Sequence, residues 1–483
     1  MTDLHLPLDR SAGRLAAQIA AGFRAGVRSG RLTAGTRLPS SRDLARDLAV
    51  SRGVVVAAYE QLTAEGFLIA RRGDGTRIAP LARPDDSPAG APARPAPARP
   101  APLPSGAAPV VPGARTPVDY DLWPGSPDLA AFPRDRWLAA ERTALRALPN
   151  EALAYPDPAG AFVLRAELAG YLGRVRAAHT DPDRIVITNG VAHALSALTR
   201  LLRANGHGVL AVEDPTSVRQ LPMLQATGIR LVRIPVDGEG IDVAALARTD
   251  ARVVLVTPAH QYPTGVVLSP GRRARLIAWA RERDGLILED DYDAEFRYDR
   301  EPVGCLQGVD PDRVVLLGSV SKALAPAIRL GWAAVPPPLA ARLRTHRLHT
   351  DLGTPVLPQH TLAEYLRGGG YDRHLRAMRR RYRTRRDALA EAIRRHVPGA
   401  RVHGVSAGIH LYVELPPGCD EDRVIARAAR AGLSVAGARP MWSSGRAPHA
   451  RPALVLGYAG LGEGRLVKAA ELLGQAVATG AQG

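Results

Sequence analysis

A proline-rich segment between residues 80 and 118 constrains the fold of this chain more than any other feature. Each of its prolines fixes one backbone φ angle and removes one N–H donor, so the segment cannot form a regular helix or sheet. Few large apolar side chains remain there to build a core. We therefore expect a semi-rigid, extended linker over residues 80–118 that separates two folded parts, residues 1–79 and 119–483. Besides Pro80 at its start, the segment has prolines at positions 84, 88, 92, 95, 97, 100, 102, 104, 109, 112 and 117.

The rest of the composition is that of a globular protein with more than one domain. A chain of 483 residues exceeds one ordinary core, and 46% hydrophobic with 23% charged residues is typical of folded proteins. No secretory signal is visible and no apolar run reaches membrane-spanning length, so we expect a cytoplasmic protein without membrane contact. The two cysteines, Cys305 and Cys419, lie far apart and suggest neither a disulfide framework nor a metal cluster, and we expect no metal site.

The net charge of +17 suits a polyanionic partner, because contacts of Lys and Arg with phosphates release counterions. Arginine is spread along the whole chain, however, and an arginine-rich composition alone produces the same charge. Charge therefore does not decide the function, and a motif is needed.

Residues 1–79 show the pattern of a helix-turn-helix. A first helix is predicted over residues 11–29, with an apolar face at every third or fourth residue. Ser40 and Asp43 have the spacing of a capping box, which predicts the start of a second helix, and Ser51 is placed to cap a third. Two short helices joined by a tight turn form a helix-turn-helix, in which the second helix enters the major groove of DNA. A helical dimerisation module with solvated arginines is the alternative.

A basic hairpin follows these helices and is placed to act as a wing. Residues 67–70 and 76–79 are predicted to pair around the glycine-containing turn 71–75. The segments GRLTAGTRLPSSRDLARDLAVSRGVVVAAYEQLTAEGFL and RRGDGT resemble the GntR-type winged-helix regulators. This resemblance implies double-stranded operator DNA as a partner, contacted by Arg42, Ser51, Arg52, Gly73 and Gly75. Gly53 and Val54 depart from the polar residues that are frequent there.

From residue 118 onward, short apolar runs alternate with helical patterns, as in an α/β domain with a mostly parallel sheet. Helices are predicted at 191–203 and 270–283. The apolar runs predicted as buried strands are 184–188, 209–212, 252–257, 285–289 and 314–317.

Two segments at predicted strand ends carry reactive side chains. Lys322 follows Gly318-Ser319-Val320-Ser321 and precedes Arg329, a set suited to bind a phosphorylated aldehyde covalently and to hold its phosphate. A surface lysine beside serines is the ordinary alternative. Asp290 and Tyr292 lie in Leu288–Asp293, where a carboxylate can keep a pyridine nitrogen protonated and a phenol can contact a ring hydroxyl. The alternative for this acidic run is a solvated or metal-binding loop.

Two further segments also follow strands. The loop 257–265 is rigid and able to present side chains to a ligand. Residues 188–193 combine a glycine with the start of a helix, whose free N–H groups can bind phosphate. Neither segment is decisive alone, but the order and the strand-end placement of all four indicate a ligand site.

Taken together, these segments resemble the fold type I aminotransferases and, with the N-terminal part, the MocR/PdxR subfamily of GntR regulators. The resemblance rests on YPDPAGAFVLRAELAGYL, ITNGVAHAL, VTPAHQYPTGV, LEDDYDAEFRYD, LGSVSKALAPAIRLGW, RHLRAMRRRYRTRRDAL and SAGIHLYVEL. It implies large and small aminotransferase-like domains, a homodimer, and pyridoxal 5'-phosphate as cofactor. By position, Lys322 would bind the cofactor covalently and act as the catalytic residue, and Arg219 would bind an effector carboxylate. The other implied cofactor-binding residues are Asp290 for the pyridine nitrogen, Tyr292 for the ring hydroxyl, and Ser319, Arg329, Val191 and Ala192 for the phosphate.

The departures from this pattern concern the substrate more than the cofactor. Ser217 replaces an aromatic that stacks on the ring, and Ala192 replaces a frequent Gln. Val455 replaces an arginine for the substrate carboxylate, for which Arg446 and Arg451 are alternative sources of charge. Tyr262 replaces an Asn of the true aminotransferases, a change shared with the regulators. We therefore expect cofactor binding without efficient transamination.

Three functions are compatible with these observations. The first is a transcriptional regulator that senses pyridoxal phosphate, or an amine or amino-acid effector, in its aminotransferase-like domain. The second is a working aminotransferase with a DNA-binding head, against which Val455 argues. The third is a regulator whose second domain only dimerises, against which Lys322 and Asp290 argue because packing requires neither.

Overall fold

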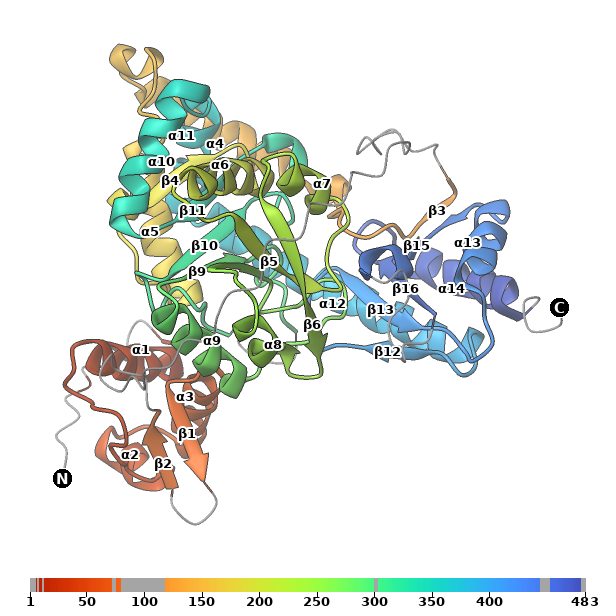
Figure 1. Cartoon of the computed structure of the whole chain (residues 1–483), viewed down its shortest axis with the longest axis horizontal. Helices are drawn as coiled ribbons and strands as arrows, with labels where there is room; N and C mark the ends of the chain where they lie inside the picture. The colour runs from red at the N-terminus through yellow and green to blue at the C-terminus, as the bar shows by residue number, and fades with distance from the viewer. Residues whose placement is uncertain are drawn as a thin grey trace.

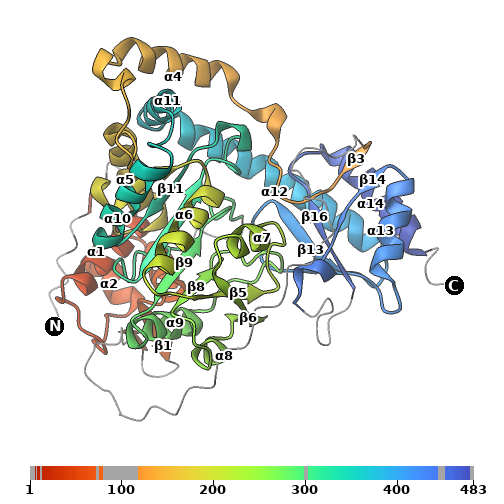
Figure 2. The ribbon, with the colours of Figure 1, turned by 45° about the horizontal axis from the view of Figure 1, so that its top comes forward.

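A computed structural model of the chain describes residues 6, 8–10, 13–71, 75–79, 118–298, 303–443 and 452–478. The predicted linker therefore lies, apart from residue 118, outside the described residues, and so do Gly73, Arg446 and Arg451. The molecule has three parts, an N-terminal head, a large α/β domain and a smaller C-terminal domain (Figures 1 and 2).

The head, residues 13–79, is a three-helix unit with a two-stranded hairpin. Its helices α1 and α3 pack together around Ile19, Phe23 and Leu62. Helix α1 begins four residues later than predicted, because Gly13 and Arg14 both have left-handed backbone conformations that interrupt a helix. The elements are α1 (Leu15–Arg28), α2 (Ser41–Asp47), α3 (Arg52–Ala64), β1 (Leu68–Arg71) and β2 (Gly75–Ile78), and the last two pair antiparallel.

The two predicted helix caps of the head differ. Ser40 precedes α2, and its hydroxyl accepts the backbone N–H of Asp43 at 3.2 Å, which confirms Ser40 as the helix cap. The Asp43 carboxylate accepts the Ser40 hydroxyl at 2.6 Å instead of the Ser40 backbone N–H of a full capping box. Ser51 precedes α3 as expected, but its side chain makes no cap hydrogen bond. The prediction of a side-chain cap at Ser51 was wrong, although the start of the helix was right.

The large domain contains a sheet with strand order β4-β11-β10-β9-β8-β5-β6-β7. The central strands β10, β9, β8, β5 and β6 run parallel. At one end of the sheet β11 pairs antiparallel with β10 and with the edge strand β4, and at the other end β7 pairs antiparallel with β6. The five predicted strands agree with the observed ones to within two residues at each end. The strands are β4 (Ile185–Thr188), β5 (Val209–Asp214), β6 (Arg230–Asp237), β7 (Gly240–Ile241), β8 (Val253–Val256), β9 (Leu286–Asp290), β10 (Val314–Ser319) and β11 (Gly331–Ala334).

Helices cover both faces of this sheet, so its strands are apolar on both sides. Alternating side chains of β5 separate two cores: Leu210 and Val212 pack with α6 and α10, whereas Ala211 packs with α8 and α9. The helices of the domain are α4 (Arg134–Ala147), α5 (Phe162–Arg176), α6 (Val191–Ala204), α7 (Gln220–Gln225), α8 (Val243–Ala247), α9 (Pro270–Glu282), α10 (Pro337–Thr350) and α11 (Val356–Arg367). Short 3-10 turns lie at Leu129–Ala131, Asn150–Leu153, Pro182–Arg184 and Pro326–Ile328.

The long helix α12 (Gly370–His396) leads into the smaller domain (Figure 1). There the antiparallel sheet β12-β13-β16-β15 lies beside α13 and α14, and a short parallel pair joins β14 to β3. None of the described helices is long and apolar enough to cross a membrane. The elements are β3 (Tyr120–Asp121), β12 (Arg401–His403), β13 (His410–Glu414), α13 (Glu421–Arg430), β14 (Leu433–Ser434), β15 (Ala436–Gly437), a 3-10 turn at Arg439–Met441, β16 (Ala453–Gly457) and α14 (Glu463–Ala478).

Candidate cofactor site at the strand ends

The carboxyl ends of the parallel strands bring several predicted site residues to one edge of the sheet. Asp290 ends β9 and lies in register with Leu317 of β10, whose last residue is Ser319. Lys322 follows three residues after Ser319, and helix α6 begins directly after the turn that ends β4. In open α/β sheets, ligands bind at this edge.

Lys322 is enclosed beside the segment that precedes α4. Its ammonium donates a hydrogen bond to the carbonyl oxygen of Gly125 at 2.5 Å. Burial lowers the pKa of this amine, and the positive charge of Arg219 lowers it further, while Asp293 and Asp290 oppose the change. A lowered pKa increases the share of the unprotonated amine, the form that attacks an aldehyde carbon.

Asp290 has one carboxylate oxygen with a partner and one without. One carboxylate oxygen, Oδ2, accepts a hydrogen bond from Nε2 of Gln220 at 2.9 Å. The other, Oδ1, is buried and has no hydrogen-bond partner. Burial raises the pKa of Asp290 to about 6, because the charged form has little solvation, although Gln220 partly offsets this. A protonated ring nitrogen would satisfy Oδ1, so this side chain fits a pyridinium.

The start of α6 brings together groups that can bind an anion. Gly190 precedes the helix with φ +84°, and no side chain caps the N–H groups of Val191 and Ala192. The Arg329 guanidinium donates to the carbonyl oxygen of Asn189. A Cβ on Gly190 would lie only 3.0 Å from this guanidinium. The Ser319 hydroxyl lies at the adjacent strand end and accepts the N–H of Ser321 at 3.3 Å. Helix N–H groups, a guanidinium and a hydroxyl together are an anion-binding set.

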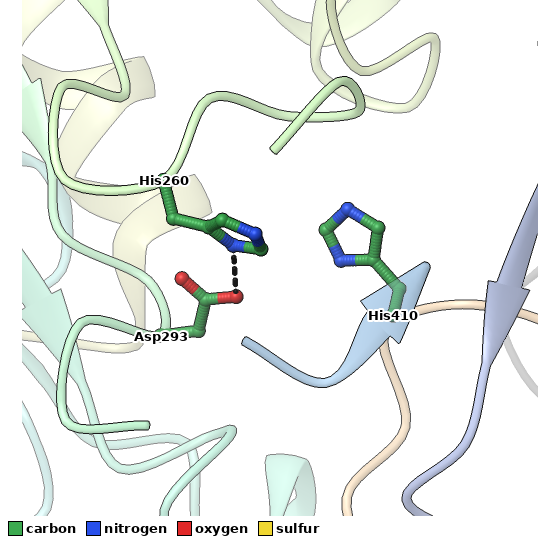
Figure 3. Close-up of side chains that lie close together, drawn as sticks. All are labelled: His260, Asp293 and His410. Carbon is green, nitrogen blue, oxygen red and sulfur yellow. Dashed lines mark hydrogen bonds and ion pairs between the residues drawn. The ribbon is translucent and has the colours of Figure 1, made fainter. Parts of the chain in front are cut away.

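A cluster of hydrogen-bonded side chains lies next to these residues (Figure 3). Nδ1 of His260 lies 2.9 Å from Oδ2 of Asp293, and both side chains are buried. The Tyr292 hydroxyl lies 3.1 Å from the same Nδ1 and donates to the His260 carbonyl oxygen at 3.0 Å. The hydroxyl of Tyr292 is thus fixed by the backbone and by a histidine that Asp293 orients.

His410 lies beside this cluster, and its ring centroid is 5.1 Å from that of His260. Its Nε2 lies 3.1 Å from the carbonyl oxygen of Pro263, and burial lowers its pKa to about 4, so this imidazole is neutral. His260, Asp293 and His410 have ligand atoms within 4.8 Å of one another, a spacing compatible with a metal ion. Hydrogen bonds already engage one ring nitrogen of each histidine, and among the described residues no further His, Cys, Asp or Glu joins this group.

Strand β16 of the smaller domain carries an apolar cluster. Val455 is fully buried, lies opposite Tyr412 and Ala436 in the sheet, and packs in a cluster with Met441. Trp123 and Tyr262 border the same cluster. The Val455 side chain offers no charge for a ligand carboxylate there.

Arg219 and Ser217 lie in the loop between β5 and α7. Arg219 is exposed, and its charge lowers the pKa of both Lys322 and Tyr262, although burial raises the latter to about 12 overall. The structure therefore brings Arg219 into electrostatic range of Lys322, as an effector-binding residue would require.

In the head, the predicted DNA-contacting residues described by the structure are all exposed. Arg42 lies in the first turn of α2, and Ser51 and Arg52 lie at the start of α3. Nε of Arg52 is 3.4 Å from the Ser41 hydroxyl, which links the starts of the two helices. Gly75 begins β2 with φ +81°. A helix start with exposed arginines is suited to contact phosphates.

Sequence reasoning missed several residues that complete the site. Gln220, Gly125 and the pair His260–Asp293 contact predicted residues but were not predicted themselves. His260 and Asp293 lay within the segments that carried the family resemblance, so their ionisable side chains were an available signal. Gln220 gave no such signal, because its role depends on the fold alone.

Comparison with known families agrees with the two-part architecture. Residues 15–78 match the family described as bacterial regulatory proteins, gntR family, and residues 125–434 match aminotransferase class I and II. The fold class predicted from the sequence is thereby confirmed.

Several named proteins are similar to the chain over most of its length. The HTH-type pyridoxine biosynthesis transcriptional regulator PdxR of Corynebacterium glutamicum is 35% identical and covers 85% of each chain. The probable rhizopine catabolism regulatory protein MocR of Rhizobium meliloti is 33% identical, over 83% of this chain and 81% of the relative. Among solved structures, the kynurenine aminotransferase of Pyrococcus horikoshii has a TM-score of 0.68 and 26% identity, over 75% of this chain and 91% of its own.

Proposed function

Because the chain belongs to the MocR/PdxR subfamily of GntR-family transcriptional regulators, with its aminotransferase class I and II domain, we propose that this domain makes it a ligand-responsive DNA-binding protein. Pyridoxal phosphate, or an amine that reacts with it, would stabilise one arrangement of the molecule and so change the affinity of the heads for an operator. The regulator PdxR is similar over both parts of the chain, which supports this proposal over that of a true aminotransferase.

The buried, unpartnered Oδ1 of Asp290 is the observation that carries the cofactor proposal. Pyridoxal phosphate would supply an aldehyde, a ring nitrogen and a phosphate to the three groups arranged at the sheet edge. Lys322 would hold the aldehyde carbon, Asp290 the ring nitrogen, and Tyr292 the ring hydroxyl. The phosphate would be held by Arg329, Ser319 and the N–H groups of Val191 and Ala192. Arg219 would bind an acidic group of the effector.

The protein is proposed to act as a cytoplasmic homodimer. Nine large apolar side chains are exposed on or beside α4, α5, α10 and α11, and a second copy would cover them. A twofold dimer would present two heads to two half-sites of an operator. The exposed side chains are Leu129, Leu138, Leu145, Leu153, Tyr155, Phe162, Leu348, Leu352 and Leu357.

Sedimentation of one matched pair of variants tests the dimer. Leu145→Asp on α4 places a charge within this surface and is expected to yield a monomer at concentrations where the wild type is a dimer. Val467→Asp replaces an exposed apolar side chain on α14 and serves as the control. A Leu145→Asp protein that remains dimeric would rule out this surface.

Selection of binding sites from a random DNA pool with the full chain tests the proposed function. We expect specific duplexes to be recovered, with an affinity that depends on added pyridoxal phosphate. Arg52→Ala should weaken binding to every duplex and reduce the salt dependence by about one unit of slope if Arg52 contacts a phosphate. Arg31→Ala, an exposed arginine after α1, is the control. Failure to recover any duplex would contradict the proposal, and an unchanged slope would assign Arg52 another role.

A further inference from the structure

The head docks on the large domain through polar contacts. Figure 1 shows α1 and α3 on the side of the head that faces the body. The body contributes residues 303–308, here called the docking segment, together with Ala177 at the end of α5.

Glu65, directly after α3, is the central residue of this contact. It is 1% exposed and accepts two hydrogen bonds from Arg24, at 2.7 and 2.8 Å. The same carboxylate accepts the backbone N–H of Gly304 at 3.2 Å. A Cβ on Gly304 would lie 2.8 Å from the Glu65 carboxylate, so the docked head leaves no space for a side chain at that position.

Arg28, at the end of α1, makes the second contact. Its guanidinium donates to the carbonyl oxygen of Gly308 at 3.1 Å and to that of Ala177 at 3.1 Å. Both acceptors are backbone atoms of the body. Arg28 can therefore make both hydrogen bonds only when the docking segment and the end of α5 keep this relative position.

The other side of the docking segment is bound to the strand that carries Asp290. Glu289 accepts the N–H groups of Leu306 and Gln307 at 3.0 and 3.1 Å. Asp291 accepts two hydrogen bonds from Arg176, from Nε at 2.7 Å and from Nη2 at 2.9 Å. Arg176 also donates to the carbonyl oxygen of Val303 and accepts the N–H of Cys305 at 2.9 Å through its own carbonyl.

Side chains alternate between the two faces of a strand, so Asp290 points away from its two neighbours. Glu289 binds the docking segment directly, and Asp291 reaches it through Arg176. A displacement of Asp290 therefore moves Glu289 and Asp291 as well, and with them the backbone groups that hold Glu65 and Arg28. Coupling between two sites can be carried by packed and hydrogen-bonded elements whose arrangement both sites bias.

We infer that the docking segment couples occupancy of the Asp290 site to docking of the DNA-binding head. This inference rests on the proposed function and names the residues through which ligand binding would affect the head. A ligand that pairs with the orphaned Oδ1 of Asp290 fixes the end of β9, and the fixed strand holds the docking segment in the arrangement that binds the head. By linkage, loss of docking must weaken ligand binding by the same factor that the ligand strengthens docking.

Three variants of the full chain test this inference, with pyridoxal phosphate as the probe. Gly304→Ala places a methyl group against Glu65, and Arg28→Ala removes two contacts from the side of the head, far from Asp290. Gly271→Ala is the control, because it adds the same methyl group at an exposed position with nothing within 4 Å. Spectral titration gives the dissociation constant of pyridoxal phosphate, and thermal unfolding verifies that each variant is folded.

We expect Gly304→Ala and Arg28→Ala each to raise this dissociation constant by about fivefold or more, the range of ordinary allosteric coupling, and Gly271→Ala to leave it unchanged. Unchanged affinity in Arg28→Ala would overturn the inference, even if Gly304→Ala binds more weakly, because the effect would then lie within the body. In that case the proposed function would stand. Failure of the wild type to bind pyridoxal phosphate would instead contradict the proposed function itself.

Discussion

The strand ends of the large domain and the sheet of the smaller domain around β16 differ in chemistry. On the side of β9, β10 and α6 lie charged and polar groups that can bind a ligand. Among them are Lys322, whose pKa is lowered, and Oδ1 of Asp290, which has no hydrogen-bond partner. On the side of β16, Val455 and its neighbours form a closed apolar cluster. The first side can bind and hold a cofactor, whereas the second supplies no charge to orient a substrate carboxylate. On the proposed function, binding and turnover would depend on different residues, and the chain has the groups proposed for binding.

The largest effect is expected at Lys322 on the polar side. Lys322→Ala removes the amine that would bind the aldehyde carbon, so the visible absorbance band of added pyridoxal phosphate should lose its protein-dependent component. Borohydride reduction of the wild type should add the cofactor mass to the peptide containing Lys322, and mass spectrometry of the digest measures this. A normal band in Lys322→Ala would remove Lys322 from the proposed role.

A smaller effect is expected at Asp290, where both the affinity for pyridoxal phosphate and the stability of the fold should change. Asp290→Asn keeps the shape but loses the charge, so pyridoxal phosphate should bind about tenfold or more weakly, since hydrogen bonds to charged groups contribute roughly 1.5–3 kcal/mol. Without cofactor the same variant should be more stable than the wild type at pH 7. Keeping this buried group ionised costs on the order of 2–3 kcal/mol, as its pKa of about 6 implies. Denaturant unfolding checks the second effect.

The stability effect of Asp290 has a defined pH dependence. Its pKa rises on folding from 3.8 to about 6, so the folded chain binds this proton more tightly than the unfolded chain. The protonated Asp290 therefore contributes to the free energy of unfolding. This stabilisation is fully present below about pH 4 and is lost as the pH rises through 6. Asp290→Asn should remove this part of the pH dependence between pH 4 and 6 in protein without cofactor. An identical profile in both proteins would show that Asp290 is solvated or paired in solution.

An effect confined to the effector is expected at Arg219. Arg219→Ala should reduce the spectral response to amines that carry an acidic group by about tenfold, because one charge-assisted contact is lost. The response to amines without an acidic group should change little. Titration of the cofactor-loaded protein with matched pairs of such amines measures the difference, and an equal loss for both kinds would assign Arg219 to the cofactor instead.

The smallest effect on cofactor binding is expected on the apolar side. Val455→Ala should leave the dissociation constant of pyridoxal phosphate within about twofold of the wild type, while destabilising the fold by on the order of 2 kcal/mol through the lost packing. Spectral titration and denaturant unfolding of one preparation measure both. A large loss of affinity would show that the apolar side also holds the cofactor and would end the distinction between the two sides.

Much of this architecture could be predicted because its signals are local. Asp290 and Lys322 follow apolar runs that end at one edge of a parallel sheet, so their proximity follows from topology. The contact of Glu65 with Gly304 spans 239 residues and depends on how two domains meet, which no periodicity encodes. Gln220 is a similar case, because its hydrogen bond to Asp290 depends on the path of the loop after β5. The missing side-chain cap at Ser51 depends on rotamer choice, which spacing cannot specify.

The candidate site is expected to bind pyridoxal phosphate without efficient transamination. A coupled assay with common amino donors, 2-oxoglutarate and pyruvate measures turnover, and a spectral titration with the same amines measures binding in parallel. Without an oriented carboxylate, a reacting bond is not held in the required geometry, which can cost orders of magnitude in rate. We therefore predict a spectral change with turnover well below about 1 per second. Multiple turnovers at or above that rate would contradict the account and establish a working aminotransferase.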